Sequence, residues 1–349
     1  MTRLHRWTLV AGAACLALAA VSGVRVAAAP AAGPYHLIKK VTLGGPGGWD
    51  YFAVEPGTKR VFIPRDTHMQ IVGPDGLVIR DVPGMNGAHG IAFAPEIGRA
   101  FTTNGRAQSI TVFDLKTLLQ MRDVPTPDRL PDGILYEPVS KRVFTFNAPT
   151  HDATAIDATS FAAAGHVELA GKPETAQADG EGHVFVNIES KSELTEFDAR
   201  TLRVMHTWPL APCKEPSGLA IDVAHKRLFA GCHSGIMAVI DYTTGKVVST
   251  FPIGQGVDAT RFDAGTQLAF ASCGDGTITV AHEDAPDHYT VVQTIHTERG
   301  ARTMALDPMT HQVYTVTSQF GPAPAPTAQD PHPRPTRVPN TFTLLIYGK

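Results

Sequence analysis

A short phrase of the form "RVF", or a close variant of it, recurs seven times along the chain. It begins at Arg60, Arg99, Arg142, His183, Arg227, Leu268 and Gln312. The third residue is always aromatic, and successive aromatics are 39, 43, 41, 44, 41 and 44 residues apart: Phe62, Phe101, Phe144, Phe185, Phe229, Phe270 and Tyr314. Self-similarity at about 40 residues indicates a repeat architecture, and the content of each period decides whether helices or strands build it.

Each period holds four short apolar segments. In the fifth period they are "GLAIDVA", "RLFAGC", "MAVID" and "KVVSTFPI". Such segments, rich in Val, Ile and Phe and separated by Gly, Pro and Asp, are typical of strands joined by tight turns. The uninterrupted amphipathic stretches of about 10–15 residues that a helical array needs are absent. The sequence therefore predicts an all-β, seven-bladed β-propeller, with each repeated aromatic packed between adjacent sheets.

The two ends of the repeat region predict how the ring closes. The seventh period supplies only three strands, whereas a spare apolar segment stands at residues 35–43. We expect this N-terminal strand to complete blade seven, because ring closure removes exposed strand edges. A Pro-rich segment at residues 318–340 interrupts the last blade and predicts a projecting loop. The expected domain is residues 35–349.

Residues 1–29 have the pattern of a secretory signal peptide. Arg3 and Arg6 precede an apolar run, and small residues follow, with cleavage expected near residues 28–32. The alternative is a membrane anchor, but the run of about 15 residues is shorter than the roughly 20 that a span requires. We expect a periplasmic or secreted protein that has no membrane span after signal removal and is a monomer.

The charge balance excludes most nucleic-acid-binding classes. Without residues 1–29, the chain has 27 Lys and Arg against 33 Asp and Glu, a net charge of −6, and no basic run. Nucleic acid is therefore not an expected partner. The chain also lacks a haem C-x-x-C-H motif, a nucleotide-binding glycine loop and the common hydrolase motifs.

The repeated phrases also resemble a known family. "RAFTTN" and "RVFTFN", followed by "ITVFD" and later "MAVIDYTTGKVV", resemble the YVTN repeat, and residues 35–349 resemble the YncE-like seven-bladed propellers of the bacterial periplasm. The resemblance implies a seven-bladed propeller fold and a periplasmic location. It leaves the function open, because such propellers include binding proteins, lactonases and quinone-dependent dehydrogenase subunits, and no functional residue is carried over.

The starts of the seven inner strands predict a ligand site, because the inner strands of a propeller line its central channel. The matched positions at the channel mouth are Asp50, His89, Asp132, Glu174, Ser217, Asp258 and Arg302. Converging carboxylates repel one another unless a positive charge lies among them. A divalent cation, Ca²⁺, Mn²⁺, Mg²⁺ or Zn²⁺, could be held by Asp50, His89, Asp132, Glu174 and Asp258. The alternative is a wide, wet mouth whose acids are only solvated.

A second set of polar residues is expected in loops on the same face, just outside this ring. It comprises Arg65, His68, Asn104, Arg106, Asn147, His151, His233 and Asp275. The Pro-rich segment adds His332, Arg334 and Arg337 and could cover the mouth.

Three cysteines remain after signal removal. Cys213 precedes the first strand of the fifth blade and Cys232 ends its second strand, so these neighbouring ends favour a Cys213–Cys232 disulfide. A Cys232–Cys273 pair is the alternative, although equivalent positions on adjacent blades are usually too far apart.

Two functions are compatible with the mouth. The first is a binding protein that captures a small ligand or an exported protein partner on the charged ring. The second is a lactonase-type hydrolase, in which a metal or Arg302 polarises a carbonyl and His89 or a carboxylate activates water. The second hypothesis needs a close cation or a carboxylate of raised pKa.

Overall fold

The computed structural model describes residues 1–2, 34–126, 129–327, 333 and 335–349. The chain divides into two units, Met1–Gly33 and Pro34–Lys349. Nearly all of the predicted signal peptide lies outside the described residues. Within the described part, no helix is long and apolar enough to cross a membrane.

The second unit is built almost entirely of strands. The first thirteen are β1 (His36–Thr42), β2 (Ala53–Val54), β3 (Val61–Pro64), β4 (Asp66–Val72), β5 (Val78–Ala94), β6 (Arg99–Asn104), β7 (Ser109–Asp114), β8 (Leu119–Pro125), β9 (Pro131–Glu137), β10 (Arg142–Asn147), β11 (Asp152–Asp157), β12 (Ala163–Glu168) and β13 (Pro173–Ala178). The others are β14 (His183–Ile188), β15 (Glu193–Asp198), β16 (Arg203–Pro209), β17 (Pro216–Asp222), β18 (Arg227–Cys232), β19 (Ile236–Asp241), β20 (Lys246–Pro252), β21 (Val257–Asp263), β22 (Leu268–Cys273), β23 (Thr277–Ala285), β24 (His288–His296), β25 (Met304–Asp307), β26 (Gln312–Thr317) and β27 (Thr343–Gly348). Two 3₁₀ turns, Pro95–Ile97 and Glu189–Lys191, complete the described elements.

These strands form antiparallel sheets that follow one another in chain order. Four sheets are simple meanders, β9–β12, β13–β16, β17–β20 and β21–β24, and a fifth has the order β1-β27-β26-β25. In that sheet β1 pairs with β27, from His36 opposite Gly348 to Thr42 opposite Thr343. The first strand thus joins the last sheet, as the spare N-terminal segment predicted.

The first two repeats share one continuous sheet, which the sequence did not predict. Its seven strands run from β2 to β8 through the 17-residue strand β5. The first half of β5 pairs with β4, where Val82 lies opposite Met69, and the second half pairs with β6, where Ala94 lies opposite Arg99. The described chain therefore has six hydrogen-bonded sheets, because no break in pairing separates the first two repeats.

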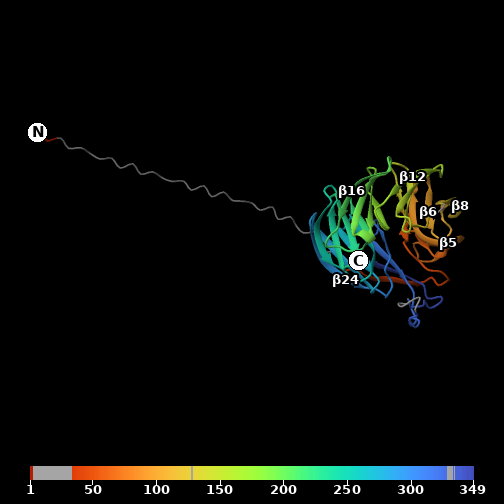
Figure 1. Cartoon of the computed structure of the whole chain (residues 1–349). Coiled ribbons are helices and arrows are strands. Elements are labelled where there is room, and N and C mark those ends of the chain that lie inside the picture. The colour runs from red at the N-terminus through yellow and green to blue at the C-terminus, as the bar shows by residue number, and fades with distance from the viewer. Residues whose placement is uncertain (3–33, 127–128, 328–332, 334) are drawn as a thin grey trace. The chain divides into compact units, whose positions relative to one another are not determined.

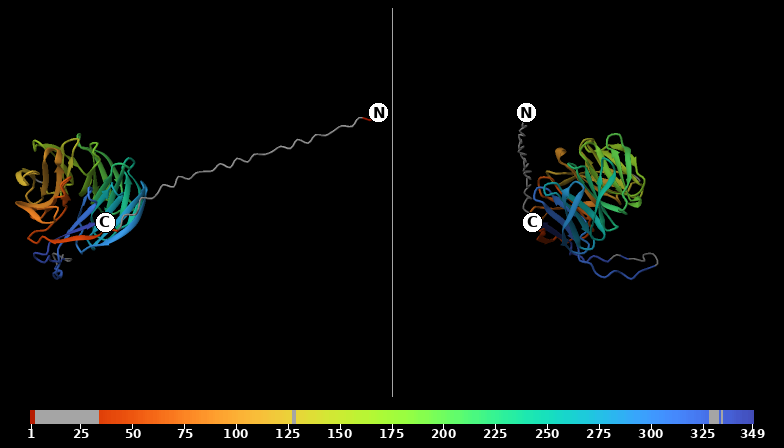
Figure 2. Two further views of the ribbon diagram at one scale, coloured as in Figure 1. Left: turned by 180° about the vertical axis from the view of Figure 1, so that it is seen from behind. Right: turned by 90° about the vertical axis from the view of Figure 1, so that its left-hand side faces the viewer.

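The inner strands follow one another around a closed ring. β25 contacts β2 and β21, and contacts continue from β21 to β17, β13, β9 and β5. The ring closes between β5 and β2 through β3 and β4 of their common sheet. Figures 1 and 2 show the sheets following one another from orange through green to blue within this unit. A closed ring of twisted antiparallel sheets is the architecture of a β-propeller.

The repeated aromatics form the core between adjacent sheets, as predicted. The six phenylalanines are fully buried and Tyr314 is 4% exposed. Phe229 of β18 clusters with Val239 of its own sheet and with Ala269 of the next. Its ring stacks on Phe262 at 4.9 Å and meets Tyr289 edge-on at 5.5 Å. Each sheet alone would leave this apolar face in water, so neighbouring sheets stabilise one another.

The described cysteines agree with the preferred pairing. Cys213 and Cys232 form a disulfide, and Cys273 is a buried free thiol. The disulfide joins the segment before β17 to the end of β18, beside the channel end that carries the predicted site residues.

Replacement of Phe229 by Ala tests the role of the repeated aromatic. We expect the free energy of unfolding to fall by about 3–5 kcal/mol, because a cavity would open between two sheets. The control is Val292→Ala on the outer strand β24, where the side chain is exposed and the expected loss is below about 1 kcal/mol. Guanidinium denaturation measures both, and equal losses would contradict the packing role.

Candidate functional site

Seven segments that are distant in sequence bring the predicted mouth residues together. A cavity of about 480 Å³ is lined by six of them, Asp50, Asp132, Glu174, Ser217, Asp258 and Arg302. The seventh, His89, contacts Asp50 and Asp132 at its rim. All inner strands run in the same direction, so their first residues meet at one end of the channel.

Local irregularities in the inner strands position these side chains. In β9, Pro131 pairs with Asn147 and Ile134 with Thr145, so two residues, Asp132 and Gly133, lie opposite one. The same kind of register shift surrounds His89, Glu174, Ser217 and Asp258. A β-bulge bends the strand and changes the direction of the side chain at that point. Five of the seven mouth residues therefore lie in bulges.

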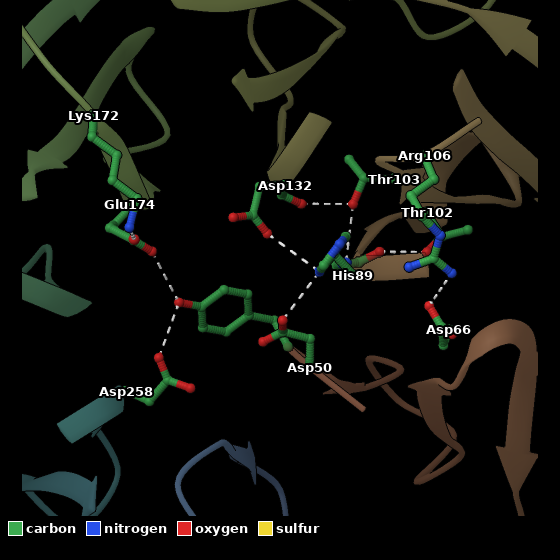
Figure 3. A network of polar contacts seen from close by, with 12 residues as sticks. Asp50, Asp66, His89, Thr102, Thr103, Arg106, Asp132, Lys172, Glu174 and Asp258 are labelled. Atoms are coloured by element: carbon green, nitrogen blue, oxygen red, sulfur yellow. Dashed lines mark hydrogen bonds and ion pairs between the residues drawn. The ribbon is translucent and has the colours of Figure 1, made fainter. Parts of the chain in front are cut away.

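His89 lies between two carboxylates. Its Nδ1 is 3.1 Å from Oδ2 of Asp50 and 3.5 Å from Oδ1 of Asp132, and Figure 3 shows the two acids approaching the ring from different sides. The hydrogen bond with Asp50 raises the pKa of His89, partial burial opposes it, and the charge of Asp132 adds to the rise. Burial raises the pKa of Asp132, and the neighbouring His89 partly offsets that rise.

Arg302 neutralises the opposite side of the mouth. Its Nε donates a hydrogen bond to Oδ2 of Asp258 at 2.8 Å, and its Nη2 is 3.8 Å from Oδ1 of Asp50. The hydroxyl of Ser217 donates a 3.3 Å bond to the same Asp258. Burial nevertheless raises the pKa of Asp258 against the effect of Arg302.

Glu174 is an acid of the mouth whose pKa is raised far above its usual value. Lys172 lies 2.5 Å from it and also contacts Glu189 of the Glu189–Lys191 turn (Figure 3 shows Lys172 beside Glu174). Burial still raises the pKa of Glu174 to about 8, because desolvation of its carboxylate outweighs the lysine. At neutral pH this carboxyl therefore holds a proton for much of the time.

Tyr51 is the central residue that the sequence analysis missed. Its hydroxyl is 3.3 Å from Oε2 of Glu174 and 3.4 Å from Oδ1 of Asp258, and its single proton can serve only one of them at a time. Burial raises the pKa of Tyr51 well above its usual value. Tyr51 also lines a second cavity of about 470 Å³ deeper in the channel, with Arg261. It therefore separates the mouth from the channel interior.

A signal for Tyr51 was present in the aligned phrases. The residue after each mouth position is small in the other six: Gly90, Gly133, Thr175, Gly218, Ala259 and Thr303. A Cβ atom on Gly218 would lie 2.6 Å from the backbone nitrogen of Thr260, so the inner strands approach closely there. Tyr51 is the large residue among these seven positions, which indicates that its side chain extends into the open channel.

The predicted metal ligands separate into two groups. One ligand atom each from Asp50, His89 and Asp132 lie within 4.8 Å of one another, a set that could hold a metal ion. Glu174 and Asp258 are instead engaged by Lys172 and Arg302. The geometry thus favours a three-ligand set over the five-residue set expected from the sequence.

Several residues of the polar set predicted outside the ring hold the backbone or strand ends in place. Asn104 and Asn147 end strands, are buried, and donate hydrogen bonds to Thr111 and Thr154 rather than standing in loops. Arg65 is fully buried and its guanidinium binds backbone carbonyls, including that of Gly48 at 2.9 Å.

The other members of this set have different surroundings. Arg106 pairs with Asp66 at 2.6 Å (Figure 3). Asp275 accepts a turn hydrogen bond from the backbone of Thr277 and a second bond from the backbone of Gln255, 20 residues away. His68 lies 3.9 Å from Asp81, and no mouth residue contacts either His68 or His151 among the described interactions. His233 does line the mouth and lies 3.8 Å from Glu189. His332 and Arg334 are outside the described residues.

Comparison with known proteins supports the fold and does not assign a family. No family model and no curated protein matches the sequence. Among solved structures, the chain is similar to "Kuenenia stuttgartiensis Hydrazine Synthase", with a TM-score of 0.67, 13% identity, and coverage of 77% of this chain and 92% of that chain. At this identity the similarity concerns the fold alone and supports a β-propeller.

The raised pKa of Glu174 predicts a pH-dependent stability. An unfolded chain releases this proton near pH 4.5, whereas the native carboxyl keeps it to about pH 8. Between these values the native state binds more protons, so the free energy of unfolding falls as pH rises. Glu174→Gln should flatten this decline in metal-free protein, measured by guanidinium denaturation from about pH 5 to about pH 8. The exposed Glu168→Gln variant should keep the wild-type slope. A slope unchanged in Glu174→Gln would contradict the assignment.

Proposed function

We propose that this chain is an exported binding protein that captures a small, positively charged group at the mouth of its central channel. One observation carries the proposal: five carboxylates converge on a single cavity, Asp50, Asp132, Glu174, Asp258 and Glu189, the first two joined through His89. Arg302 and Lys172 are the permanent cations in its described lining.

The electrostatics of the mouth support a cationic ligand. Asp132, Glu174 and Asp258 all have raised pKa values because burial is not fully compensated by the neighbouring cations. A divalent cation or a ligand ammonium group would supply the missing positive charge and release the protons that these acids retain. The same carboxylates can also accept hydrogen bonds from the ligand.

The repeat pattern supports a ring of seven blades and a YncE-like propeller. The long strand β5 serves two repeats, so the shared sheet counts as two blades and the ring as seven. The YVTN-like phrases would then place the chain among the YncE-like propellers. The N-terminal pattern of Arg3, Arg6 and an apolar run supports export to the periplasm or the medium.

A second candidate, metal-assisted hydrolysis of a lactone or ester, rests on two particular features. Asp50, His89 and Asp132 fit a divalent cation, which would polarise a carbonyl and lower the pKa of bound water. Glu174 supplies the carboxyl of raised pKa that this chemistry needs. Protonated at neutral pH, it could donate its proton to the leaving alkoxide, while Arg302 holds negative charge.

Calorimetric titration with Mn²⁺, and separately with 1,4-diaminobutane, tests the binding function. We expect at least one of them to bind with one equivalent in wild-type protein and about tenfold more weakly in Asp132→Asn, because one carboxylate of the mouth is lost. The control Glu168→Gln removes an exposed acid and should bind as wild type does. If neither cation binds to the wild-type protein, the proposal is wrong. Mn²⁺ binding alone would favour a metal site, and diamine binding alone an organic ligand.

Hydrolysis of γ-butyrolactone and phenyl acetate by Mn²⁺-loaded protein tests the second candidate. If the mouth is catalytic, Glu174→Gln should lower kcat by roughly 100-fold with little change in Mn²⁺ affinity, because the variant cannot donate the proton. Turnover no faster than that of free Mn²⁺ would exclude these substrates while leaving the binding proposal intact.

A further inference from the structure

A third cavity, the arginine cavity, lies beside the mouth and shares Arg302 with it. Its volume is about 700 Å³. The lining comes from the segment before β2, the turn after β22, the turn before β25 and the base of the Pro-rich segment, and it includes Trp49, Gly274, Arg299, Arg302, Phe320 and Arg337. Figure 2 shows this segment, in blue, extending away from the sheets in its right-hand view.

The charge of this cavity is opposite to that of the mouth. Its described lining contains three arginines and no carboxylate. The Nε and Nη2 atoms of Arg302 face the acids of the mouth. Arg337 donates a hydrogen bond from Nη1 to the carbonyl of Gly47 at 3.0 Å, and among the described residues it has no acidic partner.

The guanidinium of Arg299 has no hydrogen bond or ion pair among the described residues. Its backbone carbonyl accepts a hydrogen bond from the hydroxyl of Thr317. The neighbouring Glu298 is already paired with Lys40 at 2.5 Å. Arg299 and Arg337 therefore have no acidic partner among the described residues, whereas Arg302 is shared with the acids of the mouth. Two such guanidinium groups beside one cavity favour an anion, because they match carboxylate and phosphate oxygens geometrically.

Aromatic rings form the apolar wall of the cavity. Trp49 packs against Phe342 at 5.3 Å and Phe320 at 6.4 Å, and the guanidinium of Arg337 lies 5.6 Å from the Trp49 ring. The indole Nε1 of Trp49 is buried without a hydrogen-bond partner among the described residues. A flat, partly apolar ligand can therefore contact both a ring face and a cation.

The backbone preforms this cavity. The base of the Pro-rich segment is tied by hydrogen bonds from Gly321 to Thr336 and from Val338 to Gln319, both 2.8 Å. Gly300 has φ +80°, and a Cβ atom there would lie 2.7 Å from the ring of Phe320. The glycine thus permits Phe320 to approach the turn before β25, and the walls need no ligand to assemble.

We propose that this cavity binds the anionic group, carboxylate or phosphate, of a small ligand that carries a planar ring. The inference deepens the proposed function and rests on it in one respect: because Arg302 lines both cavities, the cationic group of the same ligand occupies the mouth. The ligand class is then a small dipolar molecule whose negative end lies among Arg299, Arg302 and Arg337.

Calorimetric titration with benzoate, phenyl phosphate and inorganic phosphate tests the anion site directly. We expect the two ring-bearing anions to bind, each about tenfold more weakly in Arg299→Gln or Arg337→Gln, because a charge-assisted hydrogen bond is lost. Trp49→Leu should weaken both ring-bearing anions and leave inorganic phosphate unchanged. Stronger binding of benzoate identifies a carboxylate ligand, and stronger binding of phenyl phosphate a phosphate ester.

The matched control is Arg203→Gln, which removes an exposed arginine from the outer strand β16. It should bind the anions as wild type does, and thermal unfolding checks that every variant is folded. Failure of all three anions to bind wild-type protein, or equal weakening by Arg203→Gln, would overturn the anion site. Mn²⁺ and diamine titrations on the same samples separate the two proposals. Cation binding without anion binding overturns only this inference. Anion binding without cation binding overturns the proposed function and the dipolar ligand class that rests on it, and leaves the anion site itself standing.

Discussion

The structure depends on the packing of apolar faces between neighbouring twisted sheets. No sheet of this chain can bury both of its faces alone, so each repeated aromatic fills the gap between one sheet and the next. The ring must then close, and pairing of β1 with β27 closes it. This closure fixes where the inner strands begin relative to one another. Ring closure therefore sets which polar side chains meet at the channel mouth.

The mouth concentrates charge that the fold itself compensates only partly. Bulges at the starts of five inner strands bring polar side chains out of regular pairing and into one cavity. Partial burial then raises the pKa of Asp132, Glu174 and Asp258, since water solvates their charged forms less well. A fold that needed only a solvated rim would not enclose these acids. Their enclosure is why a cationic ligand group is the simplest partner for the mouth.

The two neighbouring cavities have complementary charge. Acids dominate one and arginines the other, and Arg302 lines both. Tyr51 lines both the mouth and the channel interior, while Trp49, two residues earlier, forms part of the wall of the arginine cavity. Nearby residues of a single segment thus help to define both sites. Such an arrangement favours a ligand with separated opposite charges over a simple ion.

The sequence by itself determined the fold class, the buried aromatics and the seven mouth positions, because burial and strand alternation repeat with a local period that can be counted along the chain. The same alignment favoured a Cys213–Cys232 disulfide over Cys232–Cys273, and the structure contains the favoured pair. The continuous strand β5, the bulges and the role of Tyr51 were decided only in the tertiary structure. So were the pairing of Lys172 with Glu174 and the arginine cavity, in which Trp49 meets Phe320 and Arg337. These contacts join segments up to 290 residues apart, and only ring closure sets their distances and burial.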